Sequence, residues 1–449
     1  MSNQMILKSR SFAGIRSGAR MAVFGALLPC LAFVACGGGN SAPSIEGPSI
    51  TSQPGSVSTR STQPATFAVA VKGQPAPTFV WQKNGVAIPG AVAVSYTIPA
   101  TNILDAGDYR VVVSNQAGVV TSNTVTLEVK ATLLFNAPGG MAIDGSGNTY
   151  LANSGEHTIC KIQPNGDVTV LAGAPGQPGH VDATGATARF TWPTGLAIDG
   201  SGTLYVADGN NTIRVVSPSG VVTTLAGSAG LSGTTNGTGG AARFGSLLQG
   251  LTWDGSGNLL VADTYNHTIR MITTSGVVTT VAGLPGQLGA TNGTLAVATF
   301  NQPSGVAVDA AGTLYVSDYG NSVIRAISTG GTVSTFAGIV GTPGSVDGAA
   351  TTATFNGPSG IVMDGTGRLF VADTLGHIIR KVETTGAVST FAGGAAALGN
   401  LDGTGTAARF NRPSGLALGP SGSLLVADTN NREIRTISSA AVVTTYTKP

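Results

Sequence analysis

Five Asp–Arg combinations are the most regular charged feature of the sequence. Each Arg follows its Asp by six or seven residues, and successive aspartates stand 55 residues apart. A hairpin of that length places its two ends side by side, so we predict an ion pair in each copy. Five copies of one pair indicate a repeated structural staple rather than five active sites. The pairs are Asp208 with Arg214, Asp263 with Arg270, Asp318 with Arg325, Asp373 with Arg380, and Asp428 with Arg435.

The elements that must position these pairs recur with the same period. A Phe precedes a turn six times at intervals of 54 to 56 residues, at Phe135, Phe190, Phe244, Phe300, Phe355 and Phe410. In the second copy, four short apolar runs at 195–199, 204–208, 213–216 and 221–225 are separated by turn residues. Four strands joined by tight hairpins are the content of one propeller blade, and we expect six blades to close into a ring. A solenoid is the alternative, but it would need capping units at both ends.

Two segments resemble a known family. Residues 261–270 (VADTYNHTIR) and 402–415 (DGTGTAARFNRPSG) are similar to NHL repeats. The resemblance extends over residues 132–449 and implies an all-β fold, a six-bladed β-propeller. It implies no particular function, because this fold serves both binding proteins and enzymes.

The resemblance also supplies a test for catalysis. In the NHL-like lyase that cleaves amidoglycolates, zinc is held by His at the residue after Pro at the mouth of the innermost strand, and lactonase-type propellers use axial Glu, Asn and Asp. A metal site needs such charged or imidazole ligands. We therefore expect no metal, no cofactor and no catalytic residue, with a hydrolase or lyase that uses an unrecognised axial site as the alternative. The residues at the six matching axial places are none of these ligand types: they are Gly139, Thr194, Gln249, Ser304, Ser359 and Ser414.

Two further repeated sets have side chains that suit a metal. An Asp or Asn stands eight residues before five of the Phe residues, and we predict that it caps a turn, with calcium binding as the alternative. His157, His267 and His377 stand 110 residues apart in alternate copies, where a shared zinc site is the alternative. We expect them in turns between second and third strands, away from the axis. The Asx set is Asp182, Asn236, Asn292, Asp347 and Asp402.

The N-terminal residues predict export. Residues 1–35 contain four basic residues and no acid. An apolar run follows from Met21 to Cys36. This run is short for a membrane-spanning helix, and its length suits a signal peptide. Small residues before Cys36 and the Gly-rich stretch after it resemble a bacterial lipoprotein signal. The resemblance implies lipidation of Cys36, and the Gly-rich and polar composition predicts that residues 36–46 form a flexible tether. We predict an outer-membrane lipoprotein, with plain secretion or an uncleaved anchor as alternatives.

Residues 47–130 form a separate predicted domain. Alternating runs at 66–71, 79–82, 109–113 and 124–129 indicate an antiparallel sandwich. Trp81 and the segment Asp105–Tyr109 resemble the core Trp and the tyrosine corner of an immunoglobulin-like domain. The resemblance places Val69 and Val111 at the usual disulfide positions, where two apolar residues keep the core filled. Such modules usually act as spacers or adhesive arms.

The composition limits the classes of partner. Charged residues make up 10 % of the 449 residues, hydrophobic residues 42 %, and the formal net charge is +2. Low charge with many apolar residues excludes a charged disordered chain. No Lys/Arg cluster is present to neutralise phosphates, so we expect no nucleic-acid partner.

Large residues that differ between the copies are the candidates for ligand binding. Trp192, Tyr265, Tyr319, Leu375 and Arg412 are predicted on the face formed by the turns between second and third strands and by the linkers. Aromatic and Arg side chains anchor recognition surfaces, and axial Ser, Thr and Gln would add neutral hydrogen-bonding groups. We predict a non-catalytic recognition or scaffold protein that binds a protein, peptide or glycan there. The alternatives are aromatic side chains that only pack between blades and an architectural envelope protein without a specific ligand.

Overall fold

The computed structural model describes residues 44–60, 63–130, 135–419 and 421–446. The chain divides into two compact units, residues 1–132 and 133–449. Within the described ranges the regular elements are strands and short 3-10 helices, and no helix there is long and apolar enough to cross a membrane. The predicted signal segment and Cys36 lie outside the described residues.

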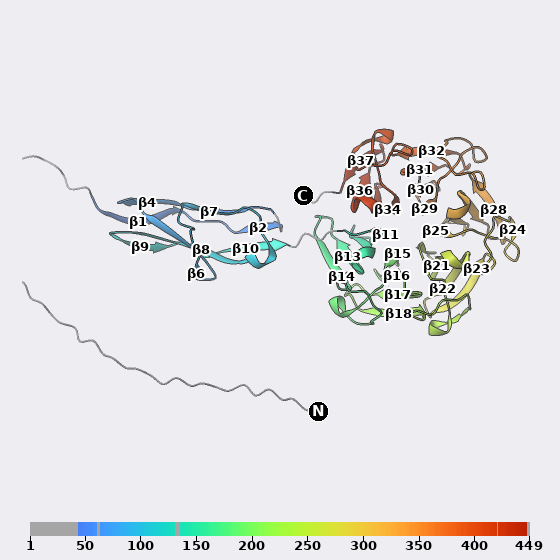
Figure 1. The fold of residues 1–449 in the computed structure, drawn as a ribbon, viewed down its shortest axis with the longest axis horizontal. Coiled ribbons are helices and arrows are strands. Elements are labelled where there is room, and N and C mark those ends of the chain that lie inside the picture. Colours follow the sequence, from blue (N-terminus) through green and yellow to red (C-terminus); the bar gives the residue numbers. More distant parts are fainter. Residues whose placement is uncertain (1–43, 61–62, 131–134, 420, 447–449) are drawn as a thin grey trace, which may run out of the picture. The chain divides into compact units, whose positions relative to one another are not determined.

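The first unit is a sandwich of short, mostly antiparallel strands (Figure 1). Its main sheet has the order β2–β10–β8–β5–β6 with β9 against β8, and the strand pairs β1–β4 and β3–β7 complete it. The elements are β1 Glu46–Ser52, β2 Val57–Arg60, β3 Ala65–Ala68, β4 Ala70–Gln74, β5 Thr78–Lys83, β6 Val86–Ala87, β7 Ser95–Ile98, η1 Ile103–Asp105, β8 Gly107–Asn115, β9 Gly118–Thr121 and β10 Val125–Lys130.

The core of this unit has the predicted immunoglobulin-like features. Trp81 is fully buried at its centre. The Tyr109 hydroxyl donates a hydrogen bond to the Asp105 carbonyl at 2.8 Å, which forms a tyrosine corner. Val69 and Val111 are buried in the same apolar cluster, so they fill the places where a disulfide is usual.

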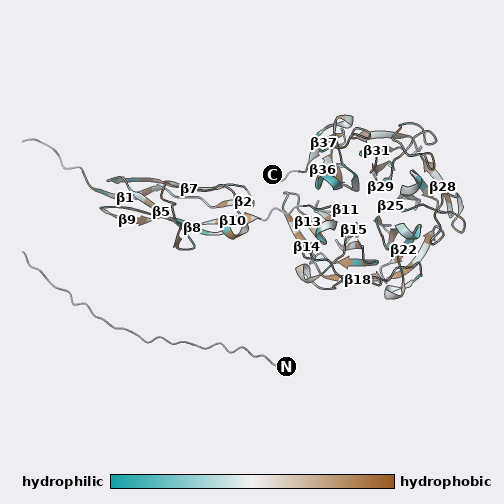
Figure 2. Ribbon diagram, viewed as in Figure 1, coloured by the Kyte–Doolittle hydropathy of each residue, from teal (hydrophilic) through white to brown (hydrophobic). Residues whose placement is uncertain are grey.

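The second unit consists of antiparallel sheets arranged around one axis, with apolar segments on strands around the ring (Figures 1 and 2). Its described strands form six blades of four consecutive strands, which follow the chain from the axis to the rim. Blade 1 is β11 Pro138–Ile143, β12 Thr149–Asn153, β13 Thr158–Ile162 and β14 Val168–Ala172; blade 2 is β15 Pro193–Ile198, β16 Leu204–Asp208, β17 Thr212–Val216 and β18 Val222–Gly227; blade 3 is β20 Leu251–Trp253, β21 Asn258–Asp263, β22 Thr268–Thr273 and β23 Val277–Ala282; blade 4 is β25 Pro303–Val308, β26 Leu314–Asp318, β27 Val323–Ile327 and β28 Thr332–Ala337; blade 5 is β29 Pro358–Met363, β30 Leu369–Asp373, β31 Ile378–Val382 and β32 Val388–Ala392; blade 6 is β34 Pro413–Leu418, β35 Leu424–Asp428, β36 Glu433–Ile437 and β37 Val442–Thr445.

Short elements in the turns and linkers complete the blades. The linker before blade 3 adds β19 to the outer strand of that blade, and β24 and β33 do the same for blades 4 and 6. The turns after second strands and the linkers also contain single 3-10 turns. These elements are β19 Gly237–Thr238, β24 Gly293–Thr294, β33 Gly403–Thr404, η2 Ser154–Glu156, η3 Gly185–Thr187, η4 Gly239–Ala241, η5 Thr264–Asn266, η6 Tyr319–Asn321, η7 Gly405–Ala407 and η8 Thr429–Asn431.

Packing between the first and last blades closes the ring. Each described blade is built from consecutive strands, so no strand is exchanged across the closing seam. Met141 of blade 1 packs with Leu425 and Ile434 of blade 6 in one buried cluster. The Thr429 hydroxyl donates to the Pro138 carbonyl across the same seam at 2.9 Å. The closed ring excludes the alternative of a solenoid.

The innermost strands touch one another through their backbones. At one glycine of each innermost segment, an added Cβ would lie less than 3.0 Å from a backbone atom of the next blade, a separation that real Cβ atoms essentially never show. Any side chain there would push two blades apart. The six glycines are Gly140, Gly195, Gly250, Gly305, Gly360 and Gly415.

We predict that Gly360→Ala lowers the free energy of unfolding of the propeller by about 2 kcal/mol or more. The new methyl group would meet the Ser414 carbonyl, and overpacking of a rigid contact is destabilising. Thermal unfolding measures the effect. Gly365→Ala is the control, because an added Cβ there meets nothing within 4 Å. Equal melting temperatures of the two variants would contradict the role of the backbone contact.

Candidate functional site

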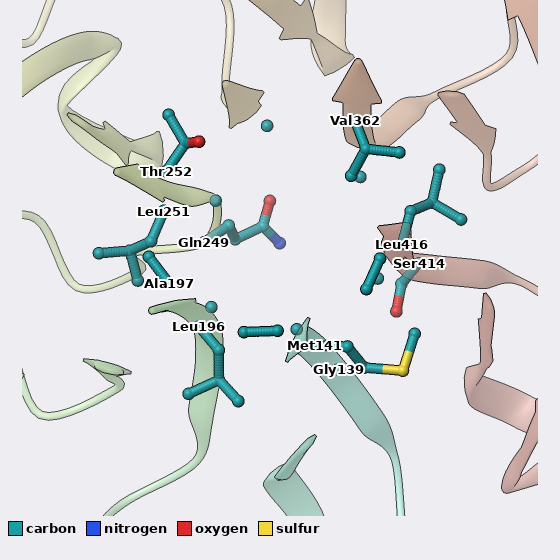
Figure 3. A pocket seen from close by; sticks show the side chains of 18 of the residues that line it. Gly139, Met141, Leu196, Ala197, Gln249, Leu251, Thr252, Val362, Ser414 and Leu416 are labelled. Carbon is teal, nitrogen blue, oxygen red and sulfur yellow. The ribbon is translucent and has the colours of Figure 1, made fainter. Parts of the chain in front are cut away.

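A cavity of about 640 Å³ lies on the axis of the ring and is lined by the innermost strands of all six blades (Figure 3). Its lining includes Pro138 and Ile143, the two ends of β11, so the cavity follows the strands along their length. None of the described residues that line it is Asp, Glu, Lys, Arg or His. The cavity therefore offers a ligand an uncharged wall.

The lining side chains form successive layers. We call the end at which the innermost strands begin, beside Gly139 and Trp192, the mouth of the cavity. The first layer inside the mouth consists of the six axial residues that the sequence predicted. A layer of large apolar side chains follows it, which consists of Met141, Leu196, Leu251, Val306, Ile361 and Leu416.

The axial hydroxyl groups bind neighbouring blades together, which corrects the expectation that they are available to a ligand. The Thr194 hydroxyl donates to the Leu248 carbonyl of the next blade at 2.6 Å. Ser304, Ser359 and Ser414 reach the next blade in the same way, directly or through a Thr hydroxyl. The expectation failed because the neighbouring carbonyl belongs to another copy of the repeat, and its position depends on how the ring closes.

The residues predicted to bind a ligand lie on the mouth side. Trp192 is the member of the set that lines the cavity, and its side chain is 53 % exposed. Arg412 is exposed at the equivalent place in blade 6. Tyr265 lies in the turn after β21 and is also half exposed.

Tyr319 and Leu375 form a separate pair on the mouth side. Both are half-buried and lie on either side of Gly357, where an added Cβ would be 2.9 Å from each side chain. Gly357 has φ +65 and stands where the second blade has Trp192 and the sixth has Arg412. A side chain at this place would collide with both neighbours, because Tyr319 and Leu375 pack over Gly357 and bury it.

Three histidines hold the loops at the mouth. The Nδ1 atoms of His157, His267 and His377 each accept a hydrogen bond at 3.1 Å from the backbone N–H of the residue before Pro in the next blade. For His157 this residue is Trp192, and the two rings also meet edge to face at 5.6 Å. Burial lowers the pKa of all three rings below the ordinary value, so the neutral imidazole that accepts at Nδ1 is favoured. Each ring therefore serves a separate seam between blades.

Blade 4 shows the repeated Asp–Arg staple in full. Arg325 Nη1 lies 3.0 Å from Asp318 Oδ2, and Nη2 lies 2.7 Å from Asn292 Oδ1. The guanidinium lies over the Phe300 ring, 5.2 Å from its centroid. Asp318 Oδ1 also accepts a hydrogen bond at 2.7 Å from the backbone N–H of Asn301 in the mouth loop. The staple thus joins the second strand, the third strand, the linker and the mouth loop of one blade.

The other four predicted pairs have the same geometry. Their Arg and Asp side chains are buried, with nitrogen–oxygen distances of 2.8 to 3.2 Å. Burial raises the pKa of each Asp, whereas the guanidinium and the N–H donors lower it. The arrangement depends on both partners, because either charge alone would be buried without compensation.

The Asx residues before each Phe are members of the staple, which corrects the prediction that they cap local turns. Asp182 Oδ1 lies 2.5 Å from Arg214 Nη2 and accepts from the Thr224 hydroxyl of the outer strand at 3.0 Å. Sequence spacing alone did not show that the linker crosses the outer strand of the next blade, where these partners are available.

Comparisons with known proteins agree with this geometry. Residues 300–326 and 410–436 match the NHL repeat, and residues 47–115 match the immunoglobulin domain. The propeller carries NHL repeats. NHL repeat-containing protein 2 from Bos taurus is 30 % identical over 344 residues, which cover 68 % of this chain and 46 % of that protein. Protein SUPPRESSOR OF QUENCHING 1, chloroplastic, from Arabidopsis thaliana is 32 % identical over 335 residues, which cover 68 % of this chain and 31 % of that protein.

The chain spans less than half the length of these two relatives. Among solved structures, this chain is similar to a protein of unknown function from Bacteroides thetaiotaomicron VPI-5482. The match covers 90 % of this chain and 99 % of that protein, with a TM-score of 0.53 and 18 % sequence identity. This likeness shows the fold of the NHL propeller chain and nothing about a ligand.

One departure from the NHL pattern was missed at the level of sequence. The segment from Phe244 to Gly250 is one residue longer than its counterparts in the other five repeats. The strand that follows it is short and places Thr252 and Trp253 in the cavity wall. Alignment of the six NHL repeats with one another would have revealed this extra residue.

We expect Arg325→Met to lower the free energy of unfolding by about 3–5 kcal/mol, because it leaves Asp318 buried without its charged partner. Urea unfolding measures the change. The double variant Asp318→Asn with Arg325→Cys imitates Asn153 and Cys160 of the first NHL repeat and should recover part of the loss. A double variant that is less stable than Arg325→Met would show that the pair is not the unit of stabilisation.

Proposed function

We propose that this protein is an exported, lipid-anchored and non-catalytic recognition protein. Its NHL propeller would hold a protein, peptide or glycan on the mouth side of the ring, and part of that ligand would enter the axial cavity. The uncharged lining of the cavity is the observation that carries this proposal. General acid–base catalysis and metal binding both need side chains that the described lining does not contain, whereas a concave apolar site with a few polar groups is typical of binding.

The mouth side supplies the anchors for such a partner. Trp192 is half exposed beside the cavity, and Tyr319 is partly exposed where it packs over Gly357. Large aromatic side chains contribute much of the binding energy at recognition surfaces. Since the immunoglobulin-like unit usually serves as a spacer in other proteins, we assign it the role of holding the propeller away from the membrane.

The variants Trp192→Ala and Tyr319→Thr should weaken capture of the partner about tenfold or more, because each removes an aromatic anchor. Ala and Thr already occupy these places in other repeats, at Ala137 and Thr374, so both variants should fold. Immobilised protein is incubated with solubilised envelope proteins, their peptide digest and peptidoglycan fragments, and retained species are quantified. Leu288→Ala, in an exposed linker position, is the control. Equal retention by the wild-type protein and the three variants would overturn the proposed site.

Replacement of Cys36 by Ser should abolish incorporation of labelled fatty acid and move the protein from the membrane pellet to the soluble fraction. The sulfur of Cys36 is the proposed lipid attachment atom, and Ser cannot replace it. Cys30→Ser makes the same chemical change six residues earlier and should leave both readouts unchanged. Labelled Cys36→Ser protein would contradict the proposed anchor.

A further inference from the structure

Blade 3 breaks the symmetry of the cavity at three neighbouring positions. Gln249 stands where the other blades have Gly, Ser or Thr, and Thr252 stands where they have Ala or Val. Trp253 replaces a smaller aliphatic residue or Met. All three residues line the cavity, so one wall differs from the other five.

The side chain of Gln249 is available to a ligand. Its backbone N–H donates to the Ala262 carbonyl at 3.3 Å, whereas its amide makes no hydrogen bond within the described part of the chain. Figure 3 shows this amide pointing into the cavity, away from the neighbouring strands. The contrast with the axial hydroxyls is direct, because those groups already donate to the next blade.

Thr252, on β20, adds a second polar group from the same blade. Its hydroxyl also makes no hydrogen bond within the described residues, and it lies in the wall beside Leu251 (Figure 3). A primary amide offers two donors and one acceptor, and a hydroxyl offers one donor and can also accept. The stripe formed by Gln249 and Thr252 therefore matches a ligand group that both donates and accepts.

The rest of the cavity fixes the other properties of the ligand. A charged ligand would lose its hydration without finding a counter-charge, since no described lining residue is ionisable. The apolar layer from Met141 to Leu416 favours an apolar body, and the Trp192 ring at the mouth favours an aromatic one. A cavity of about 640 Å³ is in the range that holds a small organic molecule.

We propose that the axial cavity binds an uncharged, largely apolar small molecule whose amide-like group pairs with Gln249. This inference goes beyond the proposed function, because it assigns a small-molecule site to the cavity itself. Gln249 determines specificity by its amide, and the aliphatic layer provides affinity that does not depend on the polar group.

Three naphthalenes of similar size test the proposal by isothermal titration calorimetry at pH 7. 2-Naphthamide carries a neutral amide, 2-isopropylnaphthalene replaces it with an apolar group, and 2-naphthoate replaces it with a carboxylate. The wild-type protein should bind the amide about tenfold more tightly than either of the others, which is the effect of one satisfied buried hydrogen-bonding group. Equal affinity for the amide and the hydrocarbon, or no binding of any probe, would overturn the proposal.

The variant Gln249→Leu should bind 2-naphthamide and 2-isopropylnaphthalene with affinities within about twofold of each other, while the hydrocarbon binds as it does to the wild type. Ser304→Ala is the matched control, because its hydroxyl already donates to Pro358, and it should keep the preference for the amide. Loss of the preference in both variants would overturn the role of Gln249.

These outcomes are independent of the capture experiment. The capture experiment changes Trp192 and Tyr319 and uses macromolecular ligands, whereas the naphthalene titrations change the cavity wall. If capture fails the variant test while Gln249→Leu loses the amide preference, the mouth-side proposal is wrong and the cavity site remains. The reverse result leaves recognition on the mouth side and removes the small-molecule site.

Discussion

The backbone contact between neighbouring innermost strands is the constraint on which the rest of the propeller depends. Six glycines allow these strands to approach so closely that no Cβ fits between them. The residues on either side of each glycine border the cavity as its axial layer and its apolar layer. The width of the cavity and the identity of its lining thus follow from one backbone contact that is repeated around the ring.

The ionisable groups of the propeller serve the seams and hairpins, which leaves the axis neutral. Asp and Arg are buried together within each of five blades, and three histidines bind mouth loops as neutral rings. The first blade shows which part of the staple is shared by all. There Asn153 Oδ1 accepts from the Asn136 N–H at 2.7 Å, which is the bond that Asp318 makes to Asn301. The common element is the acceptor that holds the mouth loop, and the Arg is an addition to it.

The sequence was sufficient to predict features that depend on local spacing. The period of the Phe and Asp residues predicted the sheets, and the hairpin length predicted which Asp and Arg lie together. Features that depend on contacts between copies were not predictable in this way. The partner of Thr194 is a carbonyl 54 residues away in the next blade, and the partner of Asp182 is an Arg 32 residues away. The packing of Tyr319 and Leu375 against Gly357 likewise depends on residues that come from two blades.

In a ring of identical blades, a ligand on the axis would meet the same wall on every side. Such a ring can select a ligand by size and polarity, but it cannot orient an asymmetric molecule unless one blade differs. Blade 3 differs through an inserted residue, and its innermost strand has three residues where those of the other blades have six. Beside the shortened strand, Gln249 gives the axis its one free amide among the described residues. A change that weakens the repeated structure at a single blade is therefore also the change that gives the cavity a direction.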